Sequence, residues 1–491
     1  MHLALPRRCR RPVFAALLIV ALAPLAKTAL GAEVQSLPAE VQAALRRAKL
    51  PESALSAVVQ EVRNGPEQSP PLLRWNEAQP VNPASVFKLL TTFAALDLLG
   101  PAWTWSTPVY FGGPVREGVL EGSLYLRGSG DPTLVMERVW LMLRHLQQLG
   151  VREIRGDIVL DRSAWSLPAS SPADFDGESS RPYNVRPDPL LLNLKAFTLT
   201  LRPDPAHGIA SVSMEPLLAG VAADTSVPLA AGPCEDWRTA LKPDWSDPGK
   251  VRLTGRYPAS CGEQPWPVAY SDPASFNARL LAQTWFELGG RLGGKVLDGT
   301  VPAGLKPAWE QRSPPLAEVV RDINKFSNNV MAEQLFLSLP GATRADASLS
   351  GSRPEDARAL LQRWLQARLG DAVQREVVVA NGSGLSRDSR VSAQALALLL
   401  AQAWQSPVMP ELISSLPVSG MDGTLRRSST TLGRAHLKTG SLRDVNAVAG
   451  FVLSNSGRRY VVVAMLNHPL AGAGRPVLDA LAQWAIDDAK R

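Results

Sequence analysis

The stretch Val81–Gly100 reads VNPASVFKLLTTFAALDLLG. Its apolar residues recur at helical spacing, Pro83 stands near a first-turn position, and the pair Gly100-Pro101 is a stop signal. The stretch therefore predicts a buried helix with Ser85 in its first turn. Ser85 and Lys88 are three residues apart, so they share one face of that helix.

This serine and lysine pair has a specific chemical use. A serine is a poor nucleophile until a base takes its proton, and a lysine in a dry, cation-crowded pocket can lose its own proton and be that base. The N–H groups of a first helical turn are free, so the N–H of Ser85 can also help to hold an oxyanion. A chain of this length contains about one or two Ser-x-x-Lys pairs by chance, so the pair needs further support.

Two further motifs supply that support. Residues 327–329 read SNN in a polar break between two helical stretches, and residues 438–440 read KTG on a predicted strand beside the terminal hairpin. Ser-x-x-Lys, then Ser-x-Asn, then Lys-Thr-Gly is the motif set of the penicillin-binding proteins and serine β-lactamases. The chain therefore resembles that superfamily.

The rest of the chain changes in texture along its length. Between residues 109 and 307, short runs such as GSLYLRG and FTLTLRP, broken by Gly, Pro, Asp and Asn, predict mostly β-structure, with a helix around 274–289. Helical patterning then returns at 316–339, 355–369 and 392–404. The tail runs HLKTGSL, NAVAGFVLS and RRYVVVAML predict antiparallel strands, followed by a helix from about Arg475.

Helices near both ends and a terminal sheet predict a multi-domain α/β protein. Its main domain is expected to be of the β-lactamase/transpeptidase type, an antiparallel sheet flanked by helices, interrupted by one or two β-rich inserted subdomains. The expected boundaries are 33–104 and 305–491 for this discontinuous catalytic domain, and 105–304 for the insertion.

The N-terminus has the pattern of a secretory signal peptide. Four arginines precede an apolar run over residues 12–26, and small residues up to Ala32 offer a cleavage site. Cleavage after residue 32 predicts an exported protein of the periplasm or extracytoplasmic cell wall; the alternative is an uncleaved membrane anchor. It also removes five of the 52 basic residues and none of the 45 acidic ones, which leaves a net charge of +2 and no basis for nucleic-acid binding.

The three cysteines fit an exported protein. Cys9 leaves with the signal peptide, and Cys234 and Cys261 remain. An oxidising compartment favours a disulfide between these two, against the alternative of two unrelated buried thiols.

More motifs narrow the resemblance to one family. A long insert separates Lys88 from Ser327 and carries GSGDPTL at 128–134 and GDIVLDRS at 156–163; later come NGSGLSR at 381–387 and SGMDGTL at 419–425. Over nearly all of the mature chain this resembles the D-alanyl-D-alanine carboxypeptidase/endopeptidases, the class C low-molecular-mass penicillin-binding proteins. One departure is Asn381, where the family pattern has an aspartate.

The resemblance implies roles for the catalytic residues. Ser85 would attack the carbonyl between two D-alanines, and Lys88 would accept its proton. Ser327 would relay a proton to the leaving amine with help from Lys438, whose charge also attracts the terminal carboxylate of the substrate. Asn329 would hold a substrate amide and fix Lys88.

The same resemblance assigns substrate contacts to the strand that carries KTG. Thr439 would hydrogen-bond the terminal carboxylate, and the N–H of Ser441 would complete the oxyanion hole with that of Ser85. Gly440 suits a strand that a ligand approaches closely. Plainer interpretations are a helix-capping Asn329 and ordinary strand residues at 439 and 441. Tyr183, in the polar stretch DFDGESSRPYN, is interpreted as a structural tyrosine; the alternative is a place in the wall of the peptide-binding cleft.

The implied function is a serine-type D-Ala-D-Ala carboxypeptidase and D,D-endopeptidase that acts on peptidoglycan peptides through an acyl-enzyme. β-Lactam antibiotics are expected as covalent inhibitors, and no cofactor or metal is expected. Peripheral membrane association and oligomeric state are left open. The alternatives are a β-lactamase, against which Ser327 and the long insert argue, and a non-catalytic penicillin-binding or wall-binding protein.

Two unrelated hydrolase classes fit less well. His436 lies two residues before Lys438 on the same side of a predicted strand, which raises a Ser-His-Asp site, but no Gly-x-Ser-x-Gly elbow is present. A partly exposed strand histidine is the better interpretation. No His-Glu-x-x-His metallopeptidase motif occurs either.

Overall fold

The computed structural model describes residues 36–63, 65, 69–343 and 351–490. The expected signal peptide, with Cys9, lies outside these residues. Among the helices so described, none combines the length and the apolar character that crossing a membrane requires.

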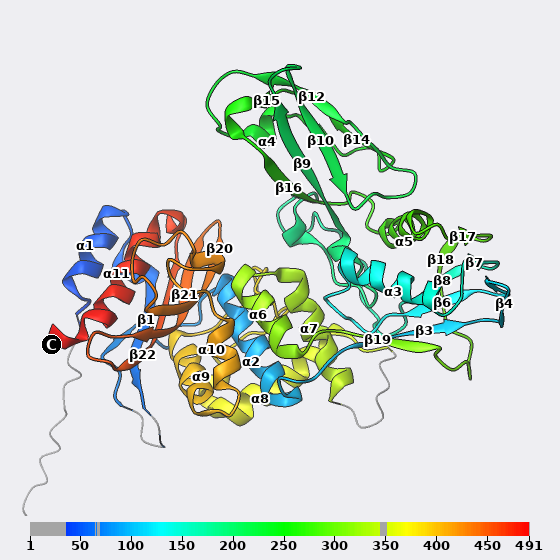
Figure 1. Cartoon of the computed structure of the whole chain (residues 1–491). Helices are drawn as coiled ribbons and strands as arrows, with labels where there is room; N and C mark the ends of the chain where they lie inside the picture. The colour runs from blue at the N-terminus through cyan, green and yellow to red at the C-terminus, as the bar shows by residue number, and fades with distance from the viewer. Residues whose placement is uncertain (1–35, 64, 66–68, 344–350, 491) are drawn as a thin grey trace, which may run out of the picture. The chain divides into compact units, whose positions relative to one another are not determined.

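The central element is an antiparallel five-stranded sheet that joins the two ends of the chain (Figure 1). Its spatial order is β2-β1-β22-β21-β20, so a strand from the N-terminal part pairs with the C-terminal hairpin along its whole length. The three strands expected from the tail are all present. The bounds are β1 (Leu55–Val62), β2 (Leu73–Trp75), β20 (Ala435–Leu442), β21 (Val445–Leu453) and β22 (Arg459–Asn467).

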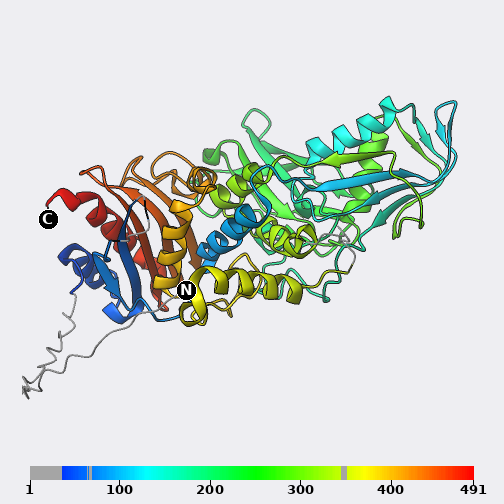
Figure 2. The same ribbon diagram turned by 90° about the horizontal axis from the view of Figure 1, so that it is seen from below.

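Helices cover both faces of this sheet, which is why its inner strands are buried at nearly every position. Successive residues of β22 point to opposite faces: Val461 and Val463 join one core, and Val462 joins the other. The second core is completed by α1 (Ala39–Arg47) and α11 (Arg475–Ile486), which lie together on that face (Figures 1 and 2).

The opposite face carries the helices that position the site. The helix expected over 81–100 is divided into a 3-10 turn η2 (Ala84–Phe87) and α2 (Lys88–Leu99), so Ser85 lies in the 3-10 turn and not in an α-helical first turn. Its neighbours in the first core are α6 (Leu316–Phe326), α7 (Asn329–Ala342), α8 (Pro354–Gln374), α9 (Ala393–Gln405) and α10 (Met409–Ser415).

The long insert contains four further groups of strands. It starts at β3 and returns at β19, and these two strands pair side by side, so the inserted sheet continues past residue 304, the expected boundary. The strands are β3 (Ser106–Phe111), β4 (Val115–Arg116), β5 (Val119–Leu120), β6 (Leu124–Arg127), β7 (Glu153–Ile154), β8 (Ile158–Asp161), β9 (Ala196–Asp204), β10 (Ile209–Glu215), β11 (Ala222–Ala223), β12 (Ser226–Ala230), β13 (Pro243–Asp244), β14 (Lys250–Leu253), β15 (Tyr257–Pro258), β16 (Gln264–Ala269), β17 (Arg291–Leu292), β18 (Val296–Gly299) and β19 (Trp309–Arg312).

Helices of the insert pack against these strands. The expected helix is present as α5 (Phe276–Glu287), and a short α4 (Trp237–Ala240) lies near the disulfide that joins Cys234 to Cys261. The helix α3 (Met136–Gln148) was not predicted, although its buried residues repeat at helical spacing. Short strands on both sides of it masked that pattern.

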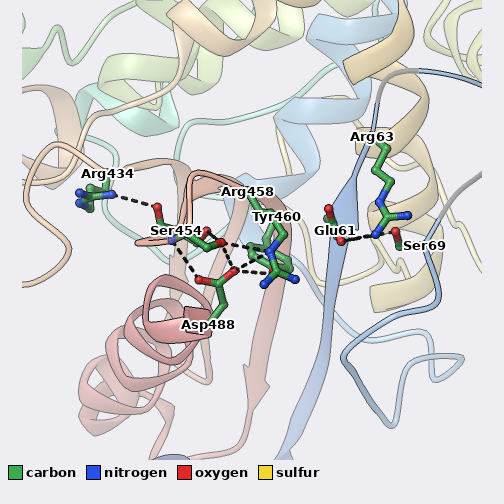
Figure 3. A network of polar contacts seen from close by, with 9 residues as sticks. Glu61, Arg63, Ser69, Arg434, Ser454, Arg458, Tyr460 and Asp488 are labelled. Carbon is green, nitrogen blue, oxygen red and sulfur yellow. Dashed lines mark hydrogen bonds and ion pairs between the residues drawn. The ribbon is translucent and has the colours of Figure 1, made fainter. Parts of the chain in front are cut away.

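A polar cluster lies at the C-terminal end of the chain, where the turn between β21 and β22 meets the residues after α11 (Figure 3). Asp488 accepts hydrogen bonds from the hydroxyls of Tyr460 at 2.8 Å and Ser456 at 2.6 Å, and pairs with Arg458 at 3.2 Å. We call these four residues the C-terminal cluster. Burial, and then the hydrogen bond to Asp488, raise the pKa of Tyr460 to about 12.

Candidate active site

The lysine of the first motif contacts the expected nucleophile directly. Lys88 Nζ lies 2.9 Å from Ser85 Oγ, 2.6 Å from Asn329 Oδ1 and 2.7 Å from the carbonyl oxygen of Ser383. The side chain is fully buried. Burial lowers the pKa of Lys88 to about 7, against a weaker opposing effect of Glu333. A lysine in this state can take up the proton of Ser85 near neutral pH.

The junction between α6 and α7 presents the second motif. Ser327 ends α6 in the left-handed conformation, with φ of 57°. The side chain of Asn328 accepts a hydrogen bond from Met331 N and so caps α7. Asn329 is therefore free of a capping role: its Oδ1 binds Lys88, and its Nδ2 donates to the carbonyl oxygen of Tyr183 at 3.1 Å.

The third motif places a second buried lysine beside the second serine. Lys438 Nζ donates to Ser327 Oγ at 2.8 Å and to the carbonyl oxygen of Thr439 at 2.8 Å. Burial, and then the charge of Lys88, hold the pKa of Lys438 well below its usual value. The structure thus brings together Ser85, Lys88, Ser327, Asn329 and Lys438, which we call the active-site cluster.

Strand β20 forms the edge of the sheet on the side of the site. Leu437 N donates to Pro417 O at 3.0 Å, away from β21. Because backbone groups alternate direction along an antiparallel strand, the N–H groups of Thr439 and Ser441 also point to this free edge. Ser441 can therefore supply the oxyanion-hole donor that the resemblance implies.

Gly440 lets this edge approach the nucleophile. A Cβ at this position would lie 2.6 Å from Pro83 O and 3.1 Å from Ser85 N, so any larger residue would push β20 away from η2. The contact explains why a glycine stands between Thr439 and Ser441.

The motif at 381–387 supports the lysine from the other side. Asn381 Nδ2 and Ser383 Oγ donate to Glu333 Oε1 at 3.0 and 2.8 Å, and the carbonyl of the same Ser383 accepts from Lys88. Asn381 stands where the family pattern has an aspartate, and its amide donates a hydrogen bond to the carboxylate of Glu333.

Glu333 was missed by the sequence analysis. It lies four residues after Asn329, hence on the same face of α7, and is a single acid in the apolar run VMAEQLF. That isolation was the available signal, since an acid on a buried helix face needs a partner. Burial raises the pKa of Glu333 to about 7, while the hydrogen bond from Ser383 and the charges of Arg186 and Lys88 lower it.

An open pocket of about 420 Å³ leads to the active-site cluster. Tyr183 belongs to its wall, 42% exposed, with its hydroxyl donating to Asp176 Oδ2 at 2.9 Å. Of the two interpretations given for Tyr183, the less favoured one, a place in the cleft wall next to Asn329, agrees with this geometry. The lining residues are Ser85, Phe175, Asp176, Tyr183, Ser327, Asn329, Leu385, Arg387, Ser441, Leu442 and Arg443.

The rival hydrolase sites are not assembled. His436 is half-buried on β20, and its Nδ1 makes no hydrogen bond in the part of the chain that the structure describes. Ser85 is paired with Lys88 instead. Over the same described ranges, no group of three or more His, Cys, Asp or Glu side chains is arranged to hold a metal ion.

Comparisons with known proteins agree with this geometry. Residues 37–487 match the model of the D-Ala-D-Ala carboxypeptidase 3 (S13) family. A D-alanyl-D-alanine carboxypeptidase of Actinomadura sp. (strain R39) is 29% identical over 488 residues, which cover 94% of this chain and 86% of that protein.

A solved structure has the same fold. Penicillin-binding protein 4 (dacB) of Haemophilus influenzae superimposes with a TM-score of 0.71 at 22% identity, over 90% of this chain and 98% of that one. The same protein in complex with a β-lactam superimposes with a TM-score of 0.66 at 22% identity, over 90% and 99% of the two chains.

Proposed function

The chain belongs to the D-Ala-D-Ala carboxypeptidase 3 (S13) family and is a serine-type hydrolase of D-alanyl-D-alanine peptides; we propose that its acyl-enzyme forms on Ser85. The observation that carries this assignment is the 2.9 Å contact between Ser85 Oγ and the fully buried Lys88 Nζ. No other described serine is joined to Lys88 through its hydroxyl in this way.

Acylation begins at Ser85. Its Oγ attacks the carbonyl carbon between the two D-alanines, and its proton passes to neutral Lys88. The N–H groups of Ser85 and Ser441 hold the oxyanion that develops on the carbonyl oxygen. Asn329 fixes the lysine through Oδ1 and keeps an amide group at the pocket wall for the substrate backbone.

Expulsion of the leaving group uses the second serine and lysine. The hydroxyl of Ser327 gives its proton to the leaving nitrogen as the C–N bond breaks, and Lys438 returns a proton to Ser327. Thr439, on the same strand, hydrogen-bonds the terminal carboxylate of the leaving residue. The remaining ester on Ser85 is hydrolysed by water, which restores the free enzyme.

This cycle serves both a carboxypeptidase and a D,D-endopeptidase, because the two reactions share the acyl-enzyme and differ in the leaving group. The substrates are peptidoglycan stem peptides and their cross-links. A β-lactam acylates the same serine, but its opened ring stays attached, so the leaving group does not depart and the ester persists. Export through the signal pattern of residues 1–32 places the enzyme with this substrate, in the periplasm or extracytoplasmic wall.

The test is acylation by penicillin. Purified protein lacking residues 1–32 is incubated with benzylpenicillin and its intact mass is recorded beside a Ser85→Ala variant. A lasting penicilloyl adduct on the first and none on the second is the expected result. Rapid antibiotic turnover without a lasting adduct would indicate a β-lactamase, and no reaction with either protein would remove Ser85 as the nucleophile.

A further inference from the structure

Two arginines line a pocket that the proposed mechanism does not use. The pocket has a volume of about 460 Å³ and lies beside the active-site cluster, since it includes Phe326, the residue before Ser327. The ring of Phe326 is 66% exposed. The lining residues are Phe326, Gly423, Thr424, Arg426 and Arg427, most of them from the end of the motif SGMDGTL and the two residues after it.

The loop that carries the arginines is fastened to the helix of the second motif. Lys325, buried at the end of α6, donates to Asp422 Oδ2 at 2.6 Å and to Leu416 O at 2.6 Å. A Cβ at Gly423 would lie 2.5 Å from Lys325 O, and the residue has a φ of +54°, so only glycine allows this close packing. The loop is thereby held two residues from Ser327.

The same loop is fastened to β20. The hydroxyls of Thr424 and Thr439 form a hydrogen bond of 2.8 Å. In the proposed mechanism Thr439 binds the carboxylate of the leaving residue, so a pocket lined by Thr424 lies on the leaving-group side. The pocket that holds Ser85 and Tyr183 is a separate one and contains neither arginine.

The charge of the arginine pocket is not compensated locally. Over residues 36–63, 65, 69–343 and 351–490, the guanidinium groups of Arg426 and Arg427 form no ion pair and no hydrogen bond, and both side chains are exposed. The acid next to them in sequence, Asp422, is already paired with Lys325. A guanidinium group binds a carboxylate through two parallel hydrogen bonds, so this surface selects an anionic ligand.

We propose that this pocket binds the second stem peptide of a peptidoglycan cross-link, with Arg426 and Arg427 holding its free carboxylates and Phe326 contacting its aliphatic part. The inference rests on the proposed function. In a carboxypeptidase reaction the leaving group is a single alanine, which ends at Thr439 and leaves the pocket empty. In an endopeptidase reaction the leaving group is a whole peptide with carboxylates of its own, and it extends into the pocket.

The experiment separates the two reactions in one protein. The variant Arg426→Ala/Arg427→Ala and the wild type are compared on a cross-linked muropeptide dimer, on a monomeric pentapeptide ending in D-Ala-D-Ala, and in acylation by benzylpenicillin. We expect kcat/KM for the dimer to fall about tenfold, as for the loss of two partly exposed charged contacts. The other two rates should stay within about twofold, since neither substrate reaches the pocket.

A matched control variant tests whether the loss is specific to the arginine pocket. Arg116→Ala removes an exposed arginine of the insert and should change none of the three rates. Equal losses on dimer and monomer, or no loss on the dimer, would overturn the pocket assignment. A wild type that cleaves the monomer but not the dimer would also overturn it, and would remove endopeptidase activity from the proposed function while leaving the carboxypeptidase reaction on Ser85, whereas failure on every substrate would refute the function itself.

Discussion

The active-site cluster and the C-terminal cluster each include a residue of the same sheet, Lys438 on β20 and Tyr460 on β22, but they differ in charge: the first contains two lysines and no acid, and the second is built around one carboxylate. In the first, Lys88 and Lys438 are both fully buried, and the charge of Lys88 adds to burial in lowering the pKa of Lys438. In the second, the carboxylate of Asp488 accepts hydrogen bonds from two hydroxyl groups and forms an ion pair with Arg458. Burial lowers the pKa of Lys88 to about 7, whereas burial, and then the hydrogen bond to Asp488, raise the pKa of Tyr460 to about 12. One cluster is prepared to move protons and the other to keep them.

The largest effect is expected when Lys88 is replaced by a residue that cannot release its proton. Lys88→Arg keeps the positive charge, but a guanidinium group cannot lose its proton in a protein. Acylation by benzylpenicillin should therefore slow by at least about a hundredfold, the usual contribution of a general base. The wild-type rate should rise with pH through about 7, because neutral Lys88 is the reactive form. The readout is the rate of adduct formation by intact mass across this pH range.

Lys195→Arg is the matched control for that experiment. Lys195 is buried too, but its partner is Asp188, at 2.7 Å, and not a serine. The rate should be unchanged. If the Lys88→Arg enzyme were acylated at the wild-type rate, Lys88 would not be the base, and neither cluster would be needed for proton transfer.

A smaller effect is expected from Glu333→Gln, which leaves the cations of the first cluster without their buried acid. The groups that face Glu333 are Lys88, with Lys438 behind it, and the arginines at 186 and 358. A glutamine oxygen still accepts the hydrogen bonds from Ser383 and Asn381, so the maximal acylation rate should fall by less than about tenfold. Glu333 raises the pKa of Lys88, so its loss should move the rising limb of the pH profile to lower pH.

That direction distinguishes an electrostatic role of Glu333 from a structural one. If Glu333 only held the backbone at Ser383, the rate would change without a shift of the profile. A shift to higher pH would contradict the charge balance described for the active-site cluster.

The smallest effect is expected at the other cluster. Burial raises the pKa of Asp488, but hydrogen bonds from Ser456 and Tyr460 lower it below its usual value. Asp488→Asn should therefore reduce the free energy of unfolding by about 1 kcal/mol at neutral pH and leave acylation unchanged. Because the folded pKa is the lower one, the stabilisation is present above the ordinary aspartate pKa and is lost as the pH falls through the folded value. Urea unfolding at neutral and acid pH measures this; equal losses at both would contradict it.

Much of this arrangement could be predicted from the sequence because it depends on local patterns. Ser85 and Lys88 are one helical turn apart, and the strand pattern of residues 435–467 is uninterrupted apart from its turns. The helix predicted over 81–100 begins with a turn of 3-10 structure that was not predicted. This turn packs closely against β20 at Gly440, and no local sequence pattern reports that contact.

The parts that were missed depend on partners distant in the chain. Glu333 accepts hydrogen bonds from Asn381 and Ser383, about fifty residues later in the chain. Tyr183, in the insert, accepts a hydrogen bond at its carbonyl oxygen from Asn329 of α7. A single acid or tyrosine carries no spacing that identifies such a partner. The departure at Asn381 was visible in the sequence, but its meaning required the carboxylate that it contacts.

The pairing of β1 with β22 sets an order on the maturation of this protein. Register partners such as Leu55 and Leu466 are about 400 residues apart in the chain, so the sheet cannot close until β22 has been synthesised. Ser85 is made early, but the strand that carries Lys438 and the oxyanion donor of Ser441 arrives late. A chain that stops before residue 435 therefore contains Ser85 and Lys88 but neither the second lysine of the active-site cluster nor the edge strand beside the nucleophile.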